Sequence, residues 1–296
     1  MNIRKSSIIG IGVCVLDRLM VVGDHPSADS VTKADCSIVS VGGGIAVAMG
    51  TASHLGSSVT MLDRLGHDEA STLIVERLRE LGVNVDSISR STKTTASEAS
   101  IWSATKTQTR SIVFCPGQEL DLELNEDHLE QIAEAEVLHI NGRHPRALEK
   151  AIRIARDKGT LVSFDGGAHR YRDGILDFVK ASDILIVAEH FARAAVDDFD
   201  VSIDEICCRF EARFPSAQVH VVTVGDKGCW YRESNLWKHH PAVLSEKTID
   251  TTGCGDAFHG GFLHAWVSGE SLSACIETAT LAASRQSEVL GSMPKV

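Results

Sequence analysis

Sequence features that would indicate a membrane protein, a zinc module or a nucleic-acid-binding protein are missing from this chain of 296 residues. Its longest apolar runs, residues 8–16 and 184–188, fall far short of the ~20 residues that a membrane-spanning helix needs, so we expect no membrane segment. The eight cysteines form no CxxC pair and no Cys/His group with zinc-finger spacing, which favours reduced thiols. The 29 basic residues are outnumbered by 40 acidic ones and do not cluster, so we expect no nucleic-acid partner.

The composition is that of a globular protein. Hydrophobic residues make up 43% of the chain and charged residues 23%, which argues against disorder and coiled coil. The first seven residues are basic, but Gly10, Gly12 and Asp17 follow without a small-residue cleavage site. We therefore predict no signal peptide and a cytoplasmic protein.

Short apolar segments alternate with amphipathic helical segments along most of the chain. Strands buried on both faces of a parallel sheet are expected at residues 8–15, 59–62, 137–140, 161–164, 184–187 and 219–224. Helices are expected at residues 68–81, 126–136, 145–158, 203–214 and 255–267. This alternation predicts an α/β fold with a doubly wound, mostly parallel sheet flanked by helices.

Two segments break the alternation, at residues 19–41 and 99–115. Both alternate polar and apolar residues and contain few helix formers, which is typical of short strands. We predict one domain over residues 1–296, in which these two insertions form a small β-sheet lid at one end of the main sheet.

The segment DTTGCGD at residues 250–256 is the most informative in the sequence. Gly253 and Gly255 allow a tight turn into a following helix, where unpaired N–H groups of the first turn form an anion site. Asp256 places a carboxylate beside that anion, which suits deprotonation of a hydroxyl that attacks phosphorus. The alternative is a helix start at which Asp256 only offsets the dipole, the more common case for a short glycine motif alone.

A second glycine-rich region lies near the N-terminus. Gly10 and Gly12 begin a pattern similar to a dinucleotide-binding fingerprint, but Val15 stands where the third glycine would fall, so we expect no dinucleotide site. Asp17 follows the first strand, and residues 42–44 form a Gly-Gly-Gly turn before a helix of small residues. Both should lie beyond the carboxyl ends of the strands, where open α/β sheets bind ligands, although Asp17 alone also fits a solvated acid in a turn.

These motifs resemble those of the ribokinase-like (PfkB) carbohydrate kinases. DTTGCGD is similar to the family's DTxGAGD signature, and GGGIAVAMGTASHLG at residues 42–56 is similar to its GGxxANxAxxxxxLG signature. The resemblance runs from residue 8 to about residue 294, and the motifs are nearest to those of ketohexokinase and sulfofructose kinase. It implies a ribokinase-like fold and an ATP-dependent sugar kinase. Such an enzyme transfers the γ-phosphoryl group to a hydroxymethyl of a small sugar or sugar derivative, of ketose or furanose type.

The resemblance also implies roles for individual residues. Asp256 would be the base that deprotonates the acceptor, and the backbone of residues 253–255 would form the anion hole. The anion-hole residues are Gly253, Cys254 and Gly255. The residues expected to bind the sugar are Asp17, Gly42, Gly43, Arg143 and Asp165. The residues expected beside the nucleotide are Thr223, Gly225 and Gly228. The lid would also build a homodimer.

Three departures from the family pattern restrict these expectations. Val47 replaces an asparagine that contacts the sugar, and an apolar side chain cannot replace those hydrogen bonds. The family's NxxE motif is absent, which leaves Glu189 near its place as a weak candidate for Mg²⁺, through a water molecule. The tail at residues 284–294 fits the family's monovalent-cation loop only loosely, so no potassium is predicted.

Several alternatives remain open from the sequence. Arg143 and Arg170 follow predicted strands on the ligand side, and either could face an anionic substituent of an acidic sugar. A nucleoside kinase is the alternative within the fold. A non-catalytic ligand-binding protein is the alternative outside enzymes, and a dehydrogenase is a third, weakened by Val15.

Overall fold

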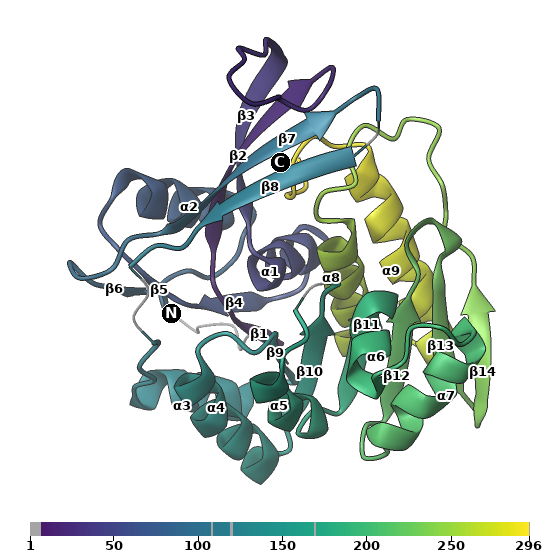
Figure 1. The fold of residues 1–296 in the computed structure, drawn as a ribbon. Helices are drawn as coiled ribbons and strands as arrows, with labels where there is room; N and C mark the ends of the chain where they lie inside the picture. The colour runs from purple at the N-terminus through teal and green to yellow at the C-terminus, as the bar shows by residue number, and fades with distance from the viewer. Residues whose placement is uncertain (1–6, 108, 119–120, 169, 296) are drawn as a thin grey trace.

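The computed structural model describes residues 7–107, 109–118, 121–168 and 170–295. Its centre is an eight-stranded sheet with the order β14-β13-β12-β11-β10-β9-β1-β4 (Figure 1). The parallel strands are β1 (Ile8–Ile11), β4 (Val59–Leu62), β9 (Val137–Ile140), β10 (Leu161–Gly166), β11 (Ile184–Ala188) and β12 (Val219–Thr223). β13 (Cys229–Glu233) and β14 (Leu236–His240) add an antiparallel edge that the sequence did not predict.

Helices cover both faces of this sheet (Figure 1). One apolar cluster joins the sheet to α1 (Gly44–His54), α2 (Glu69–Glu80), α8 (Cys254–Val267) and α9 (Leu272–Ser287). A second cluster joins it to α3 (Glu126–Glu134), α4 (Pro145–Lys158), α5 (Leu176–Lys180), α6 (Glu189–Val196) and α7 (Ile203–Arg213). Ile8 belongs to the first cluster and Ile9 to the second, because successive side chains of a strand point to opposite faces. The predicted doubly wound sheet is confirmed.

The strand predicted over residues 8–15 is in fact interrupted at residues 12–14. β1 ends at Ile11, and the chain then enters the small sheet at Val15. A Cβ at Gly10 or Gly12 would lie 2.6 Å or 2.5 Å from the side chain of Ile45 in α1. The two glycines therefore allow α1 to pack closely on β1, which explains their spacing without a dinucleotide.

The second sheet contains four strands in the order β3-β2-β7-β8, namely β2 (Val15–Val22), β3 (Ala34–Gly42), β7 (Ser97–Ala104) and β8 (Thr109–Cys115). It stands beyond the end of the main sheet at which β1 finishes (Figure 1). The predicted boundaries were a few residues late, because β2 already starts at Val15 and β7 at Ser97. A short pair, β5 (Arg64–Leu65) and β6 (Ser89–Arg90), lies below the small sheet. Among the described residues, no helix is long and apolar enough to cross a membrane.

Candidate active site

Helix α8 begins at the glycine-rich segment that the sequence singles out. Gly253 precedes the helix with a left-handed backbone (φ 79°), and a Cβ there would lie 2.8 Å from the backbone of Ser292. Within the described part of the chain, no side chain caps the start of α8. The N–H of Cys254 makes a long bond of 3.4 Å to the carbonyl oxygen of Thr251, and the N–H groups that follow in the first turn are available to an anion.

Asp256 lies in the first turn of α8 with a side chain that is 25% exposed. Its Oδ1 lies 3.6 Å from Nη2 of Arg170, and Nη1 of the same arginine pairs with Asp165. The pKa of Asp256 is raised to about 6, because burial and the charge of Asp165 together outweigh the opposing charges of Arg170 and Arg110. A carboxyl group with a pKa near 6 is mostly ionised at neutral pH and still accepts a proton, as a general base must.

The Gly-Gly-Gly turn lies between two carboxylates. A Cβ at Gly42 would collide with the carboxylate of Asp17, and a Cβ at Gly44 would lie 2.6 Å from Oδ1 of Asp256 and from Nη2 of Arg170. Between them, Gly43 has a positive φ of 92°, and a side chain there would collide with the backbone after β1. The turn therefore leaves room for the two acids to approach one site.

Asp17, on β2, is the second carboxylate of this site. Its side chain is buried and accepts a hydrogen bond of 3.0 Å from Oγ of Ser292. Burial raises the pKa of Asp17 to about 6, the hydrogen bond opposes the rise, and the nearby Asp256 and Asp250 add to it. The sequence predicted that Asp17 would lie near the turn at residues 42–44, and the structure brings them together.

A chain of buried polar groups lies behind Asp256. Asp165, 1% exposed at the end of β10, pairs with Arg170 on one side and lies 3.4 Å from Nε2 of His259 on the other. The His259 ring lies 5.2 Å from the ring of His139, whose Nδ1 lies 3.1 Å from Oγ of Ser163. The sequence analysis missed His259, although its position three residues after Asp256 places both on one face of α8.

Arg143 lies beside the site rather than in it. It lines a pocket with Arg172, and the pocket also includes Val13, whose backbone lies against Gly43. Partial burial lowers the pKa of Arg172, and the charge of Arg143 lowers it further. The Arg143 guanidinium makes no ion pair with any of the described residues.

The predicted nucleotide segment follows β12 at the same edge of the main sheet. Thr223 ends that strand, and Gly225 and Gly228 have positive φ angles of 63° and 95°. A Cβ at Gly228 would collide with the carbonyl oxygen of His240. The glycines are therefore required by the local backbone, and the role of this segment toward a nucleotide stays a prediction.

Glu189 is engaged within its own helix. Its Oε1 pairs with Nη2 of Arg193 at 2.7 Å, and the Arg193 guanidinium also donates to the backbone of Phe199 and Val201. No group of three or more His, Cys, Asp or Glu side chains that could hold a metal occurs among residues 7–107, 109–118, 121–168 and 170–295. The structure therefore lends Glu189 no support as a metal ligand.

A family model described as "pfkB family carbohydrate kinase" matches residues 5–294. The chain is a pfkB-family carbohydrate kinase. Fructokinase-1 of Zea mays is 26% identical over 88% of this chain and 82% of its own length. A nucleoside kinase of Methanocaldococcus jannaschii is 24% identical over 92% of this chain and 87% of its own length. The structure of Arabidopsis thaliana ribokinase complexed with ribose and ATP has the same fold, with a TM-score of 0.82 and 20% identity over 98% of this chain and 96% of that one.

The family settles the class of reaction for this carbohydrate kinase. It is an ATP-dependent phosphotransferase with a sugar hydroxyl as acceptor. The regulatory-protein and dehydrogenase alternatives lose their basis, whereas a nucleoside acceptor remains compatible with the relatives.

Proposed function

We propose that this kinase phosphorylates a hydroxymethyl group of a small sugar or sugar derivative, with Asp256 as the general base. The observation that carries the proposal is the placement of Asp256 at the glycine-rich start of α8, across the turn at residues 42–44 from the buried Asp17. Asp17 accepts hydrogen bonds from the sugar hydroxyls, and the backbone of Gly42 and Gly43 leaves them space.

In the proposed step, the acceptor hydroxyl gives its proton to Asp256 while its oxygen bonds to the γ-phosphorus. The bond from that phosphorus to the bridging oxygen breaks, and its electron pair leaves with ADP. N–H groups of Gly253, Cys254 and Gly255 stabilise the charge on the transferred group. Thr223, Gly225 and Gly228 lie beside the nucleotide in this proposal.

Magnesium fits the site only as a partner of the nucleotide. The nearby carboxylates are already engaged, since Asp165 pairs with Arg170, Glu189 pairs with Arg193, and Asp250 accepts from Thr252 and Gly291. We therefore infer that ATP phosphates and water supply most of the Mg²⁺ ligands, as is common for this ion. Nothing in this arrangement supports a monovalent cation.

A specific observation favours an acidic sugar as the acceptor. Arg143 and Arg172 line one pocket beside the site, at the N-terminus of α4, whose helix dipole adds positive potential. Asp121 also lines the pocket, where its Oδ2 accepts a hydrogen bond from the backbone N–H of Arg146. A carboxylate, sulfonate or phosphate substituent would relieve the repulsion between the two arginines.

A substrate panel tests the proposed function. Neutral ketoses, the corresponding sugar acids and nucleosides are assayed with ATP and Mg²⁺, and we expect turnover with the first two classes and a preference for the acids. Arg143→Ala should reduce kcat/KM for an acid about 10- to 100-fold more than for its neutral counterpart. Arg146→Ala is the matched control, because it removes another exposed arginine, three residues further along the chain. Turnover of nucleosides alone would overturn the sugar proposal.

The small sheet is the proposed lid and the proposed dimer interface. Its edge strand β8 carries Ile112, Val113 and Phe114 with exposed fractions of 52%, 55% and 42%. Large exposed apolar groups on one edge fit a second copy of the chain, and closure over the sugar would exclude water from the γ-phosphate. A cytoplasmic location is likewise proposed, and it agrees with eight cysteines that are all free.

A further inference from the structure

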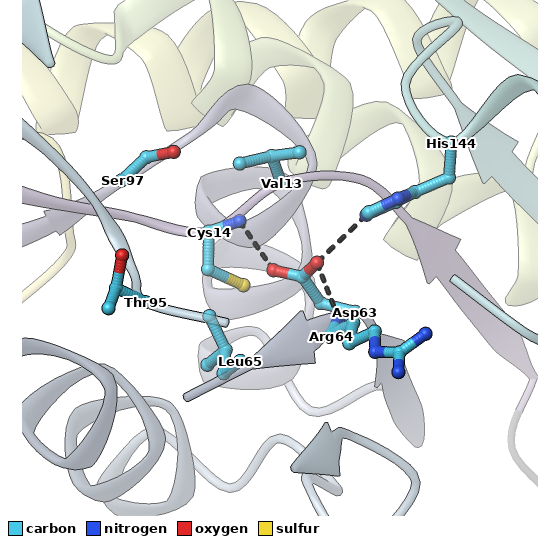
Figure 2. Close-up of a pocket in the computed structure, with 8 residues that line it drawn as sticks. All are labelled: Val13, Cys14, Asp63, Arg64, Leu65, Thr95, Ser97 and His144. Atoms are coloured by element: carbon cyan, nitrogen blue, oxygen red, sulfur yellow. Dashed lines mark hydrogen bonds and ion pairs between the residues drawn. The ribbon is translucent and has the colours of Figure 1, made fainter. Parts of the chain in front are cut away.

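Asp63 is a buried carboxylate that the proposed chemistry does not use. It follows β4, is 1% exposed and lies between Cys14 and His144 (Figure 2). Its Oδ2 accepts a hydrogen bond of 2.8 Å from the backbone N–H of Cys14. Its Oδ1 accepts from the backbone N–H of Arg64 at 2.7 Å and lies 2.9 Å from Nε2 of His144. Among the residues that the structure describes, no Lys or Arg side chain pairs with it, so the carboxylate is held by directional hydrogen bonds.

His144, the hydrogen-bond partner of Asp63, has a defined tautomer. Its Nδ1 accepts a hydrogen bond of 3.2 Å from the backbone N–H of Leu122, so the proton of the neutral ring is on Nε2, which donates to Asp63. Oδ1 of Asp121 lies 3.7 Å from the same Nδ1, beyond hydrogen-bond distance. The ring therefore joins one donor and one acceptor from distant parts of the chain.

The backbone at His144 shows why this position is special. Its φ of 56° and the φ of 80° at Gly142 are both left-handed, so the turn before α4 reverses sharply. Arg143 lies between them and points into the pocket that also contains Arg172. The direction of Arg143 thus depends on a turn that is held from one side by the bond between His144 and Asp63.

The same two side chains hold both ends of the lid. Cys14 immediately precedes β2, which carries Asp17 three residues later. Leu122 lies on the segment that returns from β8 to α3. Cys14, Leu122 and the Arg143 turn, distant in sequence, are therefore fixed to one another through the pair formed by Asp63 and His144. Figure 2 shows the bonds of Asp63 to Cys14 and to His144.

We infer that Asp63 and His144 are positioning residues for the acceptor, which fix the Arg143 turn relative to Asp17 and to the two lid connections. This inference rests on the proposed function, because Arg143 and Asp17 are its sugar-binding residues. Asp63 lies outside the pocket that Arg143 and Arg172 line, and His144, which contributes to the wall of that pocket, acts here by holding the turn. Loss of the pair leaves the base and the anion hole on α8 in place and displaces the groups that bind the sugar.

Two conservative variants test the positioning role. Asn tolerates a left-handed backbone and retains an acceptor for Leu122, but in His144→Asn it is too short to reach Asp63. Asp63→Asn keeps the shape and replaces one acceptor by a donor. For each variant we expect the KM of the best acceptor from the panel to rise about 10-fold or more, with kcat within about 3-fold of wild type. The KM rise in the double variant should be smaller than the product of the two single rises, because both variants weaken the bond between Asp63 and His144.

His220→Asn is the matched control. His220 is also buried, and its Nε2 donates a bond of 2.9 Å to the carbonyl oxygen of Phe214, far from Asp63 in the sheet order. It should leave the acceptor KM unchanged. A fall in kcat with an unchanged acceptor KM in His144→Asn, or an equal rise of KM in His220→Asn, would overturn the inference.

Hydrogen exchange without any substrate separates this inference from the proposed function. We expect backbone exchange in peptides covering residues 12–19 and 141–148 to accelerate together in both Asp63→Asn and His144→Asn, by about 5-fold or more. Acceleration confined to the peptide that carries the substitution would overturn the connection. If no sugar in the panel is phosphorylated, the proposed function fails, and the exchange result still decides whether the pair joins the two segments.

Discussion

The two sheets of this kinase differ in how their faces are covered. Strands β1 and β4 of the main sheet are fully buried, with helices on both faces. In the small sheet, Leu19 and Ile101 are buried, whereas every residue of β8 is exposed or only partly buried. We call the main sheet with its helices the platform; the small sheet, the proposed lid, has an uncovered edge strand.

The charged groups of the site follow the same division. Asp165 lies on β10 of the main sheet and Asp256 on helix α8, and both form ion pairs with Arg170. The lid reaches that network through Arg110 of β8, whose Nη1 donates a hydrogen bond of 2.9 Å to Oγ1 of Thr251. We therefore expect substitutions in the platform to affect chemistry, and substitutions in the lid to affect closure and assembly.

Asp256→Asn should have the largest effect. Without a base, turnover should fall about 10²- to 10⁴-fold, because general-base catalysis typically contributes that much. Binding of ATP, measured by calorimetry, should be retained. Turnover within a few-fold of wild type would remove Asp256 from the proposed mechanism. Substitutions in the platform would then be tolerated as well as those in the lid.

Removal of the divalent metal should abolish transfer without unfolding the protein. Because the described residues build no metal cage, excess EDTA should leave the circular dichroism spectrum and the melting temperature unchanged. Phosphoryl transfer should fall to background and return on addition of Mg²⁺. Undiminished transfer in EDTA contradicts a nucleotide-borne metal.

Arg110→Ala should have a moderate effect, of the kind expected for a lid. Loss of the bond to Thr251 should raise the acceptor KM about 3- to 10-fold and accelerate exchange in β7 and β8. Since the charge of Arg110 lowers the pKa of Asp256, the acidic limb of the kcat profile should also move to higher pH. Lys106→Ala is the control, because Lys106 pairs with the exposed Asp24 of the lid itself. An equal change in both variants would argue against a specific contact.

Phe114→Asp tests whether the exposed edge of the lid is covered by a second copy. In sedimentation experiments the variant should be monomeric under conditions in which the wild type is dimeric, because a charge in an apolar interface is costly. Leu281→Asp, at an exposed apolar position of α9, should leave the assembly unchanged. A monomeric wild type would reject the proposed dimer. The exposed face of the small sheet would then be covered only when the sugar binds.

The smallest predicted effect is on stability. The pKa values of Asp17 and Asp256 are raised to about 6, whereas an unfolded aspartate titrates near 4. The folded state therefore binds more protons between these values, so this contribution to stability is present below pH ~4 and is lost as the pH rises through ~6. At pH 7, Asp256→Asn should increase the free energy of unfolding by about 1–2 kcal/mol, measured with urea. A decrease would show that the pairing with Arg170 outweighs burial.

Local sequence patterns predicted much of this fold, because the parallel strands and several helices each carry their own periodicity. The parallel strands at residues 59–62 and 137–140 and the helix at 145–158 were predicted with their observed bounds. Helix α6 was missed because Ala188 at its start provides no side-chain cap. The β13–β14 edge was also missed, although Ser234 and Asn235, with φ of 50° and 66°, form the kind of tight turn that polar residues favour.

The candidate site was only half predictable. Asp17, Gly42 and Asp256 could be connected in advance because the sequence placed Asp17 just after the first predicted strand and the other two just before or at the start of a predicted helix, although Asp17 in fact lies in β2. The position of Arg170 between Asp165 and Asp256 depends on two loops that meet only in the folded protein. No local pattern reveals such a contact.

Cys254 gives the start of α8 an unusual chemical inertness. A thiol at a helix N-terminus normally ionises easily and reacts with electrophiles and peroxides. Here burial raises the pKa of Cys254 to about 12, and the carboxylates of Asp250 and Asp256 add to the effect despite the opposing charge of Arg110. The thiol therefore stays protonated at physiological pH, and we expect the kinase to keep its activity under oxidative conditions that inactivate enzymes with an exposed thiolate at the same place.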